Sequence, residues 1–324
     1  MPKIPQIYPR IIFVGAHVEA VLPLQHLLAR SENVVGLFTL DPAALSQISG
    51  GVDLTHFVKP AQVSVMQSRN ANDPQAVEWI DALRPDILLV VGWTQLIKPQ
   101  LLAVPSIAAL GFHASLLPRY RGRAPVNWAI LNGETETGNT LMVLDPGADQ
   151  GDIVCQRKIP ITFDDDCSTI YEKVSQTECE MLDEVLPLIR QGHLPRAKQD
   201  SAAATVMPKR RPEDGLINWT WASRRLYDWV RALTHPYPGA FTFLGGKKIM
   251  IWRAAMEGSI PNKSPGTITL DSNGWPLVAT GDGYLRLLEV ESEENGSISG
   301  LEAARSVLNS ASRFQGVPTL QGVA

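Results

Sequence analysis

The sequence predicts an α/β protein in which a Rossmann-like, mostly parallel sheet carries helices on both faces and is followed by a small, OB-like β-barrel. Up to about residue 190, short apolar runs alternate with segments of helical periodicity, as in a parallel sheet with crossover helices. Beyond residue 207, strand-like runs follow one another through glycine-containing turns, as in a small barrel. We therefore expect an α/β domain over residues 1–191, a linker over 192–206 and a barrel domain over 207–324.

The first half of the α/β domain contains five expected elements. Continuous apolar runs predict strands buried on both faces, whereas apolar residues three and four positions apart predict helices. Gly15 ends the first strand, and Pro85 ends the second helix. In chain order we expect a strand over 10–14, a helix over 18–29, a strand over 33–40, a helix over 75–83 and a strand over 86–91.

The second half of this domain carries three further strands and two helices. The prolines of the sequence SLLPRYRGRAP keep the chain irregular after the first of these strands. Ser168 is a suitable N-cap for a long helix that extends to about Arg190. In chain order we expect a strand over 107–112, a helix over 126–132, strands over 140–144 and 153–159, and the helix that Ser168 caps.

The remaining third of the chain is expected to form the barrel. Residues 192–207 are small and polar, which is typical of a linker. Trp219, Trp221 and Trp252 are expected to serve as packing anchors of the barrel. Strands are expected over 240–244, 248–252, 266–270, 276–279 and 284–290.

Two residues in the α/β domain form a candidate acid-base pair. One strand delivers His113 to its end, and the strand over 140–144 delivers a glycine-rich loop that carries Asp149. Parallel α/β sheets place reactive groups at the carboxyl ends of their strands, so both residues are expected above one edge of the sheet. A carboxylate beside an imidazole fixes its tautomer and favours its protonation. Without further context, a strand-end histidine bonded to the backbone and an aspartate bonded to its own turn are the simpler interpretations.

Composition narrows the classes of function. The net charge of −4 disfavours a dedicated nucleic-acid binder, and no DNA partner is expected. Three widely spaced cysteines form neither a zinc knuckle nor a disulfide framework, so we expect no metal and a reducing, cytoplasmic location. No segment is apolar for long enough to serve as a signal peptide or a membrane span, so no membrane partner is expected.

Several separated motifs resemble the folate-dependent formyltransferases, a family that includes the methionyl-tRNA formyltransferases. In the α/β domain these motifs are HASLLPRYRG and DPGADQGDI, and in the barrel domain they are PKRRPEDGLINW, RALTHPYPGAF and KIMIWRA. The resemblance covers nearly the whole chain and is closest in character to the aminosugar and other small-molecule N-formyltransferases. It implies transfer of a formyl group from 10-formyltetrahydrofolate to an amine or hydroxylamine nitrogen.

The resemblance also assigns site residues. His113 matches the histidine of the family's Asn-x-His motif, and Asp149 matches the aspartate of its loop. One wall of the folate site would be Gly92, Trp93, Thr94, Gln95, Leu96 and Ile97, and the opposing wall would be Asp145, Pro146, Gly147 and Ala148. Trp93 could instead fill the edge of the sheet. We expect His113 to stabilise the oxyanion and to assist proton transfer to the departing folate nitrogen, while Asp149 accepts the amine proton.

The sequence departs from the family at Gly111, where the motif has asparagine. In the family that amide resembles an oxyanion donor, and loss of one such donor costs about 2.7 to 4 kcal/mol of transition-state stabilisation. Our first interpretation is that another donor, such as Asn127 or protonated His113, replaces it. The second is a subgroup with altered chemistry, and the third is loss of catalysis.

The acceptor is expected to be a small molecule, such as an aminosugar nucleotide or an amino-acid derivative. The family's tRNA-acting members resemble one another in a basic insertion after the second strand, whereas residues 41–61 of this chain carry Lys59 as their single basic residue. Arg119, Arg121 and Arg123 are candidates for binding a phosphate or carboxylate of the acceptor, with a solvated loop as the equal alternative. His17 follows the first strand and is expected to be a surface residue.

Other functions remain open. A methionyl-tRNA formyltransferase ranks second. A hydrolase that releases formate from formyltetrahydrofolate could use the same His113 and Asp149, and a non-catalytic folate-binding protein is compatible with Gly111. A nicotinamide oxidoreductase is disfavoured, because the turn VGAHVEAV lacks the glycine spacing that lets a pyrophosphate approach a helix.

Overall fold

The computed structural model describes residues 8–258, 262–292, 296–299 and 313–314. The chain forms two compact units. The first comprises the residues up to Pro125 together with Glu136–Pro160 and Thr169–Pro208, and the second comprises Val126–Thr135, Ile161–Ser168 and the residues from Lys209 onward.

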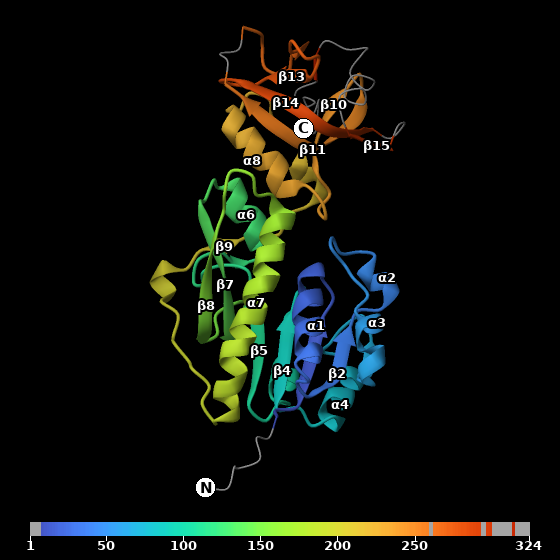
Figure 1. Ribbon diagram of the computed structural model, residues 1–324, viewed down its shortest axis with the longest axis vertical. Helices are drawn as coiled ribbons and strands as arrows, with labels where there is room; N and C mark the ends of the chain where they lie inside the picture. The colour runs from blue at the N-terminus through green and yellow to red at the C-terminus, as the bar shows by residue number, and fades with distance from the viewer. Residues whose placement is uncertain (1–7, 259–261, 293–295, 300–312, 315–324) are drawn as a thin grey trace, which may run out of the picture. The chain divides into compact units, whose positions relative to one another are not determined.

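A seven-stranded mixed sheet forms the centre of the first unit (Figure 1). Its order is β3-β2-β1-β4-β5-β7-β8, and the first five strands of this order are parallel. The last two, β7 and β8, run antiparallel to their neighbours. The strands are β1 Ile11–Gly15, β2 Val34–Thr39, β3 Ser64–Gln67, β4 Ile87–Val91, β5 Ala108–His113, β7 Glu136–Val143 and β8 Ile153–Pro160.

Helices cover both faces of this sheet, which confirms the predicted layering. Alternate residues of β1 point to opposite faces, so Ile11 and Phe13 pack with α1 and α7, whereas Ile12 and Val14 pack with α4 and α5. The helices are α1 Val21–Ala29, α2 Pro42–Leu45, α3 Thr55–Val58, α4 Pro74–Ala82, α5 Pro99–Leu102 and α7 Cys167–Arg190, with short 3-10 turns at Val18–Ala20 and Lys59–Ala61.

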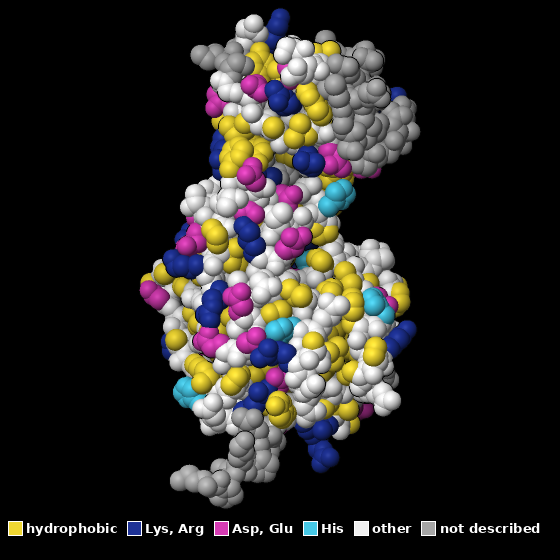
Figure 2. Space-filling model, viewed as in Figure 1, with side chains coloured by type: hydrophobic (Ala, Val, Ile, Leu, Met, Phe, Trp, Pro, Cys, Tyr) yellow, Lys and Arg dark blue, Asp and Glu magenta, His cyan; other side chains and the backbone are white. Residues whose placement is uncertain are grey.

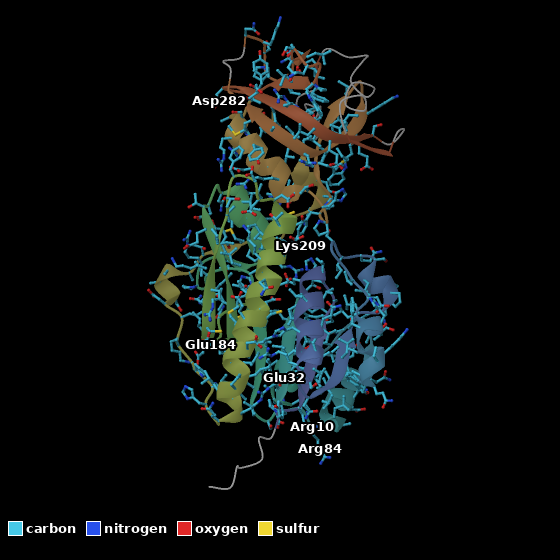
Figure 3. The ribbon with its side chains drawn as sticks, in the orientation of Figure 1. Arg10, Glu32, Arg84, Glu184, Lys209 and Asp282 are labelled. Atoms are coloured by element: carbon cyan, nitrogen blue, oxygen red, sulfur yellow. The ribbon has the colours of Figure 1, made fainter. Side chains whose placement is uncertain are left out.

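The long helix α7 begins two residues earlier than expected, at Cys167. Asp166, rather than Ser168, caps it, because the Asp166 Oδ1 atom accepts the backbone N–H of Ser168 at 2.9 Å. At its far end Arg190 pairs with Glu32, which is labelled in Figure 3. None of the helices within the described residues has the length and apolar character needed to cross a bilayer.

The second unit is built on an antiparallel sheet, with a helix packed against β11. The order is β10-β11-β14-β13-β12, and β15 pairs with β14. The elements are α6 Pro125–Leu131, α8 Ser223–Leu233, β10 Ala240–Leu244, β11 Lys247–Glu257, β12 Ile268–Leu270, β13 Pro276–Ala279, β14 Tyr284–Ser292 and β15 Gly296–Ser299, with a 3-10 turn at Pro212–Gly215. Trp219 and Trp252 are buried in this unit, and Trp221 packs edge-on against Trp229.

The segment expected to be a linker is hydrogen-bonded into the first unit. Ala197 pairs with Ile153 in an antiparallel bridge, and the two-residue strand β9 (Val206–Met207) runs parallel to β6 (Arg121–Gly122). A 3-10 turn at Ser201–Ala203 lies between these two pairings. Residues 197–207, which we call the strap, therefore lie against the loop that follows His113.

The two edges of the parallel strands differ in their roles. Arg10 precedes β1, and its guanidinium donates to the carbonyls of Leu83 and Arg84 at the amino-terminal edge (Figure 3). These contacts close the loops at that edge. His113 and the loop after β4 lie at the opposite, carboxyl edge.

Candidate active site

The His113 side chain is fixed by one strong hydrogen bond. His113 is the last residue of β5 and is 8% exposed, and its Nε2 atom lies 2.7 Å from the carbonyl oxygen of Tyr120. A carbonyl only accepts hydrogen bonds, so Nε2 carries the proton and donates it. Nδ1 is therefore the ring nitrogen that gains or loses a proton, and it faces the carboxylate of Asp149.

The structure brings Asp149 to His113, as the sequence predicted, but by a different route. Because β7 is antiparallel to β5, its end at Val143 lies beside Leu110 and not at the carboxyl edge. The loop that follows has to turn back, and Asp149 adopts a left-handed conformation with φ of 55°. Its Oδ1 atom lies 3.6 Å from His113 Nδ1, and its Oδ2 atom accepts the backbone N–H of Gly122 at 2.8 Å.

The loop of residues 92–97 leaves β4, the strand next to β5. Gly92 has φ of +57°, and a Cβ atom there would lie 2.8 Å from the Cβ atom of His17, so glycine is required. Asn72 accepts the N–H of Lys98 and donates to the carbonyl of Leu96, and Gln95 donates to the carbonyl of Arg69. The backbone of this loop is thus held from outside.

Two side chains of the 92–97 loop, Trp93 and Leu96, differ in their surroundings. The Trp93 ring packs edge-on against Phe38, yet its buried Nε1 atom has no hydrogen-bond partner among the described residues. Leu96, by contrast, is 60% exposed. On the other side of the site, the Asp145 side chain accepts the N–H of Gly147 and thereby shapes the loop over residues 145–148.

The buried carboxyl group of Glu19 supports the 92–97 loop and has a second buried carboxyl group, Glu178, nearby. The side chain of Glu19 accepts the N–H of Gly92, and burial nevertheless raises the pKa of Glu19 to about 7. Burial, together with the nearby Glu19, also raises the pKa of Glu178 on α7 well above its ordinary value, against a lowering contribution from Asn139. His17 is buried as well, contrary to the expected surface position, and burial lowers its pKa to about 4. Its Nδ1 atom accepts the N–H of Glu19.

Leu144 occupies the space that a side chain at position 111 would need. A Cβ atom on Gly111 would lie 2.6 Å from the Cδ2 atom of Leu144. The family's asparagine therefore has no room at this position unless Leu144 moves. Replacement of its amide by Asn127 is also wrong, since Asn127 is 1% exposed and its Nδ2 atom donates to the carbonyl of Ala232. Of the donors named from the sequence, protonated His113 remains.

The three arginines of the loop after His113 differ in availability. Arg121 is 7% exposed and donates from Nε and Nη2 to the Oε1 atom of Gln199, so its expected role in binding an acceptor anion is wrong. The exposed Arg123 donates to the carbonyl of Thr94. Arg119 is exposed and lies over the ring of Tyr120, so it stays a candidate for the acceptor.

Gln199 and Thr205 of the strap were missed by the sequence analysis. The Gln199 side chain bonds the loop that carries Asp149, and Thr205 bonds the backbone of Tyr120, the residue that holds His113. A lone glutamine or threonine in a polar segment gives no signal of such a role. The pairing of β6 with β9 is too short to be read from a pattern.

Both units match known protein families. Residues 30–186 match the profile described as "Formyl transferase", and residues 209–307 match "Formyl transferase, C-terminal domain". The chain is 37% identical over 286 residues to the methionyl-tRNA formyltransferase of Geobacter sulfurreducens, which covers 88% of this chain and 89% of the relative. It is 34% identical over 290 residues to that of Caldanaerobacter subterraneus, with 88% and 92% covered.

Solved structures share the fold at lower sequence identity. HypX from Aquifex aeolicus, in complex with tetrahydrofolic acid, is 20% identical with a TM-score of 0.66, covering 93% of this chain and 47% of HypX. An N-formyltransferase from Helicobacter canadensis, in complex with folinic acid and dTDP-3-aminofucose, is 16% identical with a TM-score of 0.64, covering 90% of this chain and all of that chain.

We expect Gly111→Asn to lower the free energy of unfolding by about 1 to 3 kcal/mol, because the new side chain collides with Leu144. Urea unfolding of Gly111→Asn, Leu144→Ala and the double variant measures this. The cost of Gly111→Asn should be smaller in the Leu144→Ala background. An equal cost in both backgrounds would show that Leu144 is not the obstacle.

We expect Glu178→Gln to stabilise the protein at pH 8, because it removes a carboxylate whose charged form is costly to bury. A carboxyl group whose pKa is raised by folding stabilises the folded state below its ordinary pKa of 4.5, and this contribution is lost as the pH rises through the folded pKa. The difference from the wild type should therefore be small at pH 4.5, grow as the pH rises from there toward the raised pKa of the folded state, and then level off. Glu184→Gln, on the exposed side of α7 (Figure 3), is the matched control and should show no such rise.

Proposed function

Because this chain belongs to the formyl transferase family, we propose that it transfers the formyl group of 10-formyltetrahydrofolate to the amino group of methionyl-tRNA. The family's enzymes take the formyl group from this folate. The acceptor is the proposed part, and it is supported by relatives named methionyl-tRNA formyltransferase that are 34 to 37% identical across both units. This support reverses the order in which the sequence analysis ranked small molecules and tRNA.

The 92–97 loop is the part of the site that would hold the folate. Asn72 holds its backbone, Gln95 ties it to the carbonyl of Arg69, and the exposed Leu96 offers an apolar surface. When bound, the folate supplies an activated formyl carbon. The loop over 145–148 would form the other wall.

The single observation that carries the proposed chemistry is the pairing of His113 with Asp149. Since Nε2 of His113 is committed to Tyr120, Nδ1 is the ring nitrogen left to face the reacting groups. Its proton would stabilise the negative charge that develops on the formyl oxygen while the amine attacks, and would then pass to the folate nitrogen as the bond between that nitrogen and the formyl carbon breaks. Asp149 keeps Oδ1 available to accept the proton that the attacking amine loses, while Gly122 holds Oδ2.

A small-molecule amine is the second candidate acceptor, for one specific reason. The segment over residues 41–61 carries Lys59 as its only lysine or arginine, and Asp41 at its start is paired with Arg69. Basic and acidic side chains are also interspersed on the face shown in Figure 2. Capture of a polyanion depends on clustered positive charge, so these features favour a small acceptor.

We expect His113→Ala and Asp149→Asn each to lower kcat by about 10²- to 10⁴-fold, because each removes a proton-transfer group. Binding of tetrahydrofolate, measured by isothermal titration calorimetry, should be retained in both. Asp152→Asn removes a carboxylate that is paired with Lys198 outside the site, and it is the matched control. Undiminished turnover in either variant would remove that residue from the mechanism.

Mass spectrometry of each candidate acceptor identifies the true one, because formylation increases its mass. Purified protein with 10-formyltetrahydrofolate is offered charged initiator tRNA, nucleotide-linked aminosugars and free amino acids separately. Formylation of methionyl-tRNA that weakens as salt is raised is the expected result. Formylation of a small amine alone would establish the second candidate, and formate release without any acceptor would identify a hydrolase.

A further inference from the structure

The strap over residues 197–207 contacts the loop that carries Asp149 and the segment that follows His113. At one end, Gln199 bonds the loop that contains Asp149. At the other end, Thr205 and β9 bond the segment that contains Tyr120 and Gly122. One short segment therefore touches the supports of His113 and of Asp149 together.

Every donor and acceptor of the Gln199 side-chain amide is hydrogen-bonded to residues around the candidate pair. Its Nε2 atom donates to the carbonyl of Asp149 at 2.9 Å and to the carbonyl of Gly151 at 2.7 Å. Its Oε1 atom accepts from Nε and Nη2 of the buried Arg121, at 3.1 and 2.7 Å. An amide has two donor hydrogens and two acceptor sites, and all four are engaged.

The loop needs such a support because its conformation is costly. Asp149 has a positive φ, and a Cβ atom at Gly151 would lie 1.7 Å from the carbonyl oxygen of Val143, so the chain is tightly folded on both sides of Gln199's contacts. Gln199 holds the backbone of Asp149, and the N–H of Gly122 holds its side chain. Gly122 itself belongs to β6, which the strap pairs with β9.

The histidine is held through the same strap. Thr205 Oγ1 accepts the N–H of Tyr120 at 2.8 Å, and the carbonyl of Thr205 accepts the N–H of Arg121 at 2.9 Å. The carbonyl of Tyr120 is the group that fixes Nε2 of His113. Both members of the pair are thus placed relative to one reference segment.

We propose that Gln199 is a positioning residue that sets the place of the Asp149 carboxylate relative to His113. Its amide ties the backbone of Asp149 to Arg121, whose own backbone adjoins Tyr120 and Gly122. The inference rests on the proposed function of the site, and it adds to the reaction a residue that touches neither the acceptor nor the folate.

A kinetic test separates positioning from a general structural role. Gln199→Ala should lower kcat by about ten- to a hundred-fold, as misplacement of a reacting group by about 1 Å does, with little change in KM for the folate. Gln199→Glu, which keeps an acceptor for Arg121 but loses both donors to the loop, should lose as much. Lys198→Ala, which removes the exposed neighbour paired with Asp152, is the matched control and should retain wild-type kcat.

The decisive comparison is a double-mutant cycle. If Gln199 acts through Asp149, Gln199→Ala should have no further effect on kcat in the Asp149→Asn background. Multiplied losses in the double variant, or wild-type kcat in Gln199→Ala, would overturn the proposal.

A readout that needs no turnover keeps the proposal independent of the acceptor. The ¹⁵N chemical shifts of the His113 ring nitrogens sense the nearby carboxylate, so they should change in Gln199→Ala and stay unchanged in Lys198→Ala. Unchanged His113 shifts in Gln199→Ala would overturn the positioning role. If the wild-type chain formylates no acceptor, the proposed function fails, and the shifts alone then decide whether Gln199 places Asp149.

Discussion

The antiparallel course of β7 is the constraint on which the site depends. A parallel strand would deliver the residue after its carboxyl end directly to the edge where His113 lies. Because β7 runs the other way, the chain has to leave beside Leu110 and return to the edge before Asp149 can approach Nδ1 of His113. The glycines of this loop, the left-handed Asp149 and the bonds from Gln199 all follow from that return.

Two buried carboxyl groups impose a second, electrostatic constraint. Glu19 accepts the N–H of Gly92, and Glu178 of α7 lies near Glu19. Burial makes the charged forms of both carboxyl groups unfavourable, and the proximity of the two adds repulsion. His17 offers no compensating charge, since burial keeps it neutral and its Nδ1 atom accepts an N–H. The 92–97 loop is therefore anchored by Glu19, a carboxyl group whose pKa is raised to about 7.

The sequence predicted the layers and the pair, but not what holds the pair together. Continuous apolar runs located β1, β2, β4 and β5, because a strand buried on both faces has an apolar composition, whereas the half-exposed edge strand β3 (Ser64–Gln67) was not predicted. The direction of β7 could not be predicted, since the composition of an apolar run does not indicate whether the strand runs parallel or antiparallel to its neighbour. The sequence did not predict helix α8. Charged residues such as Asp228 and Arg231 usually indicate a solvent-exposed segment, whereas these two are buried as an ion pair. Gln199 was assigned to a linker because its role exists only in three dimensions.

The replacement of asparagine by Gly111 raises the demand on the remaining groups. With Leu144 over Gly111 and Asn127 committed to Ala232, the proposed mechanism leaves Nδ1 of His113, which faces the Asp149 carboxylate, as the donor to the oxyanion. A Coulomb interaction weakens with distance, so displacement of Asp149 by a fraction of the present 3.6 Å separation would weaken both the donor and the base together. A site with two independent donors tolerates such a shift better than a site with one. We therefore expect the rigid support that Gln199 gives the Asp149 loop to matter more in this chain, which lacks an amide at position 111, than in a site with two donors.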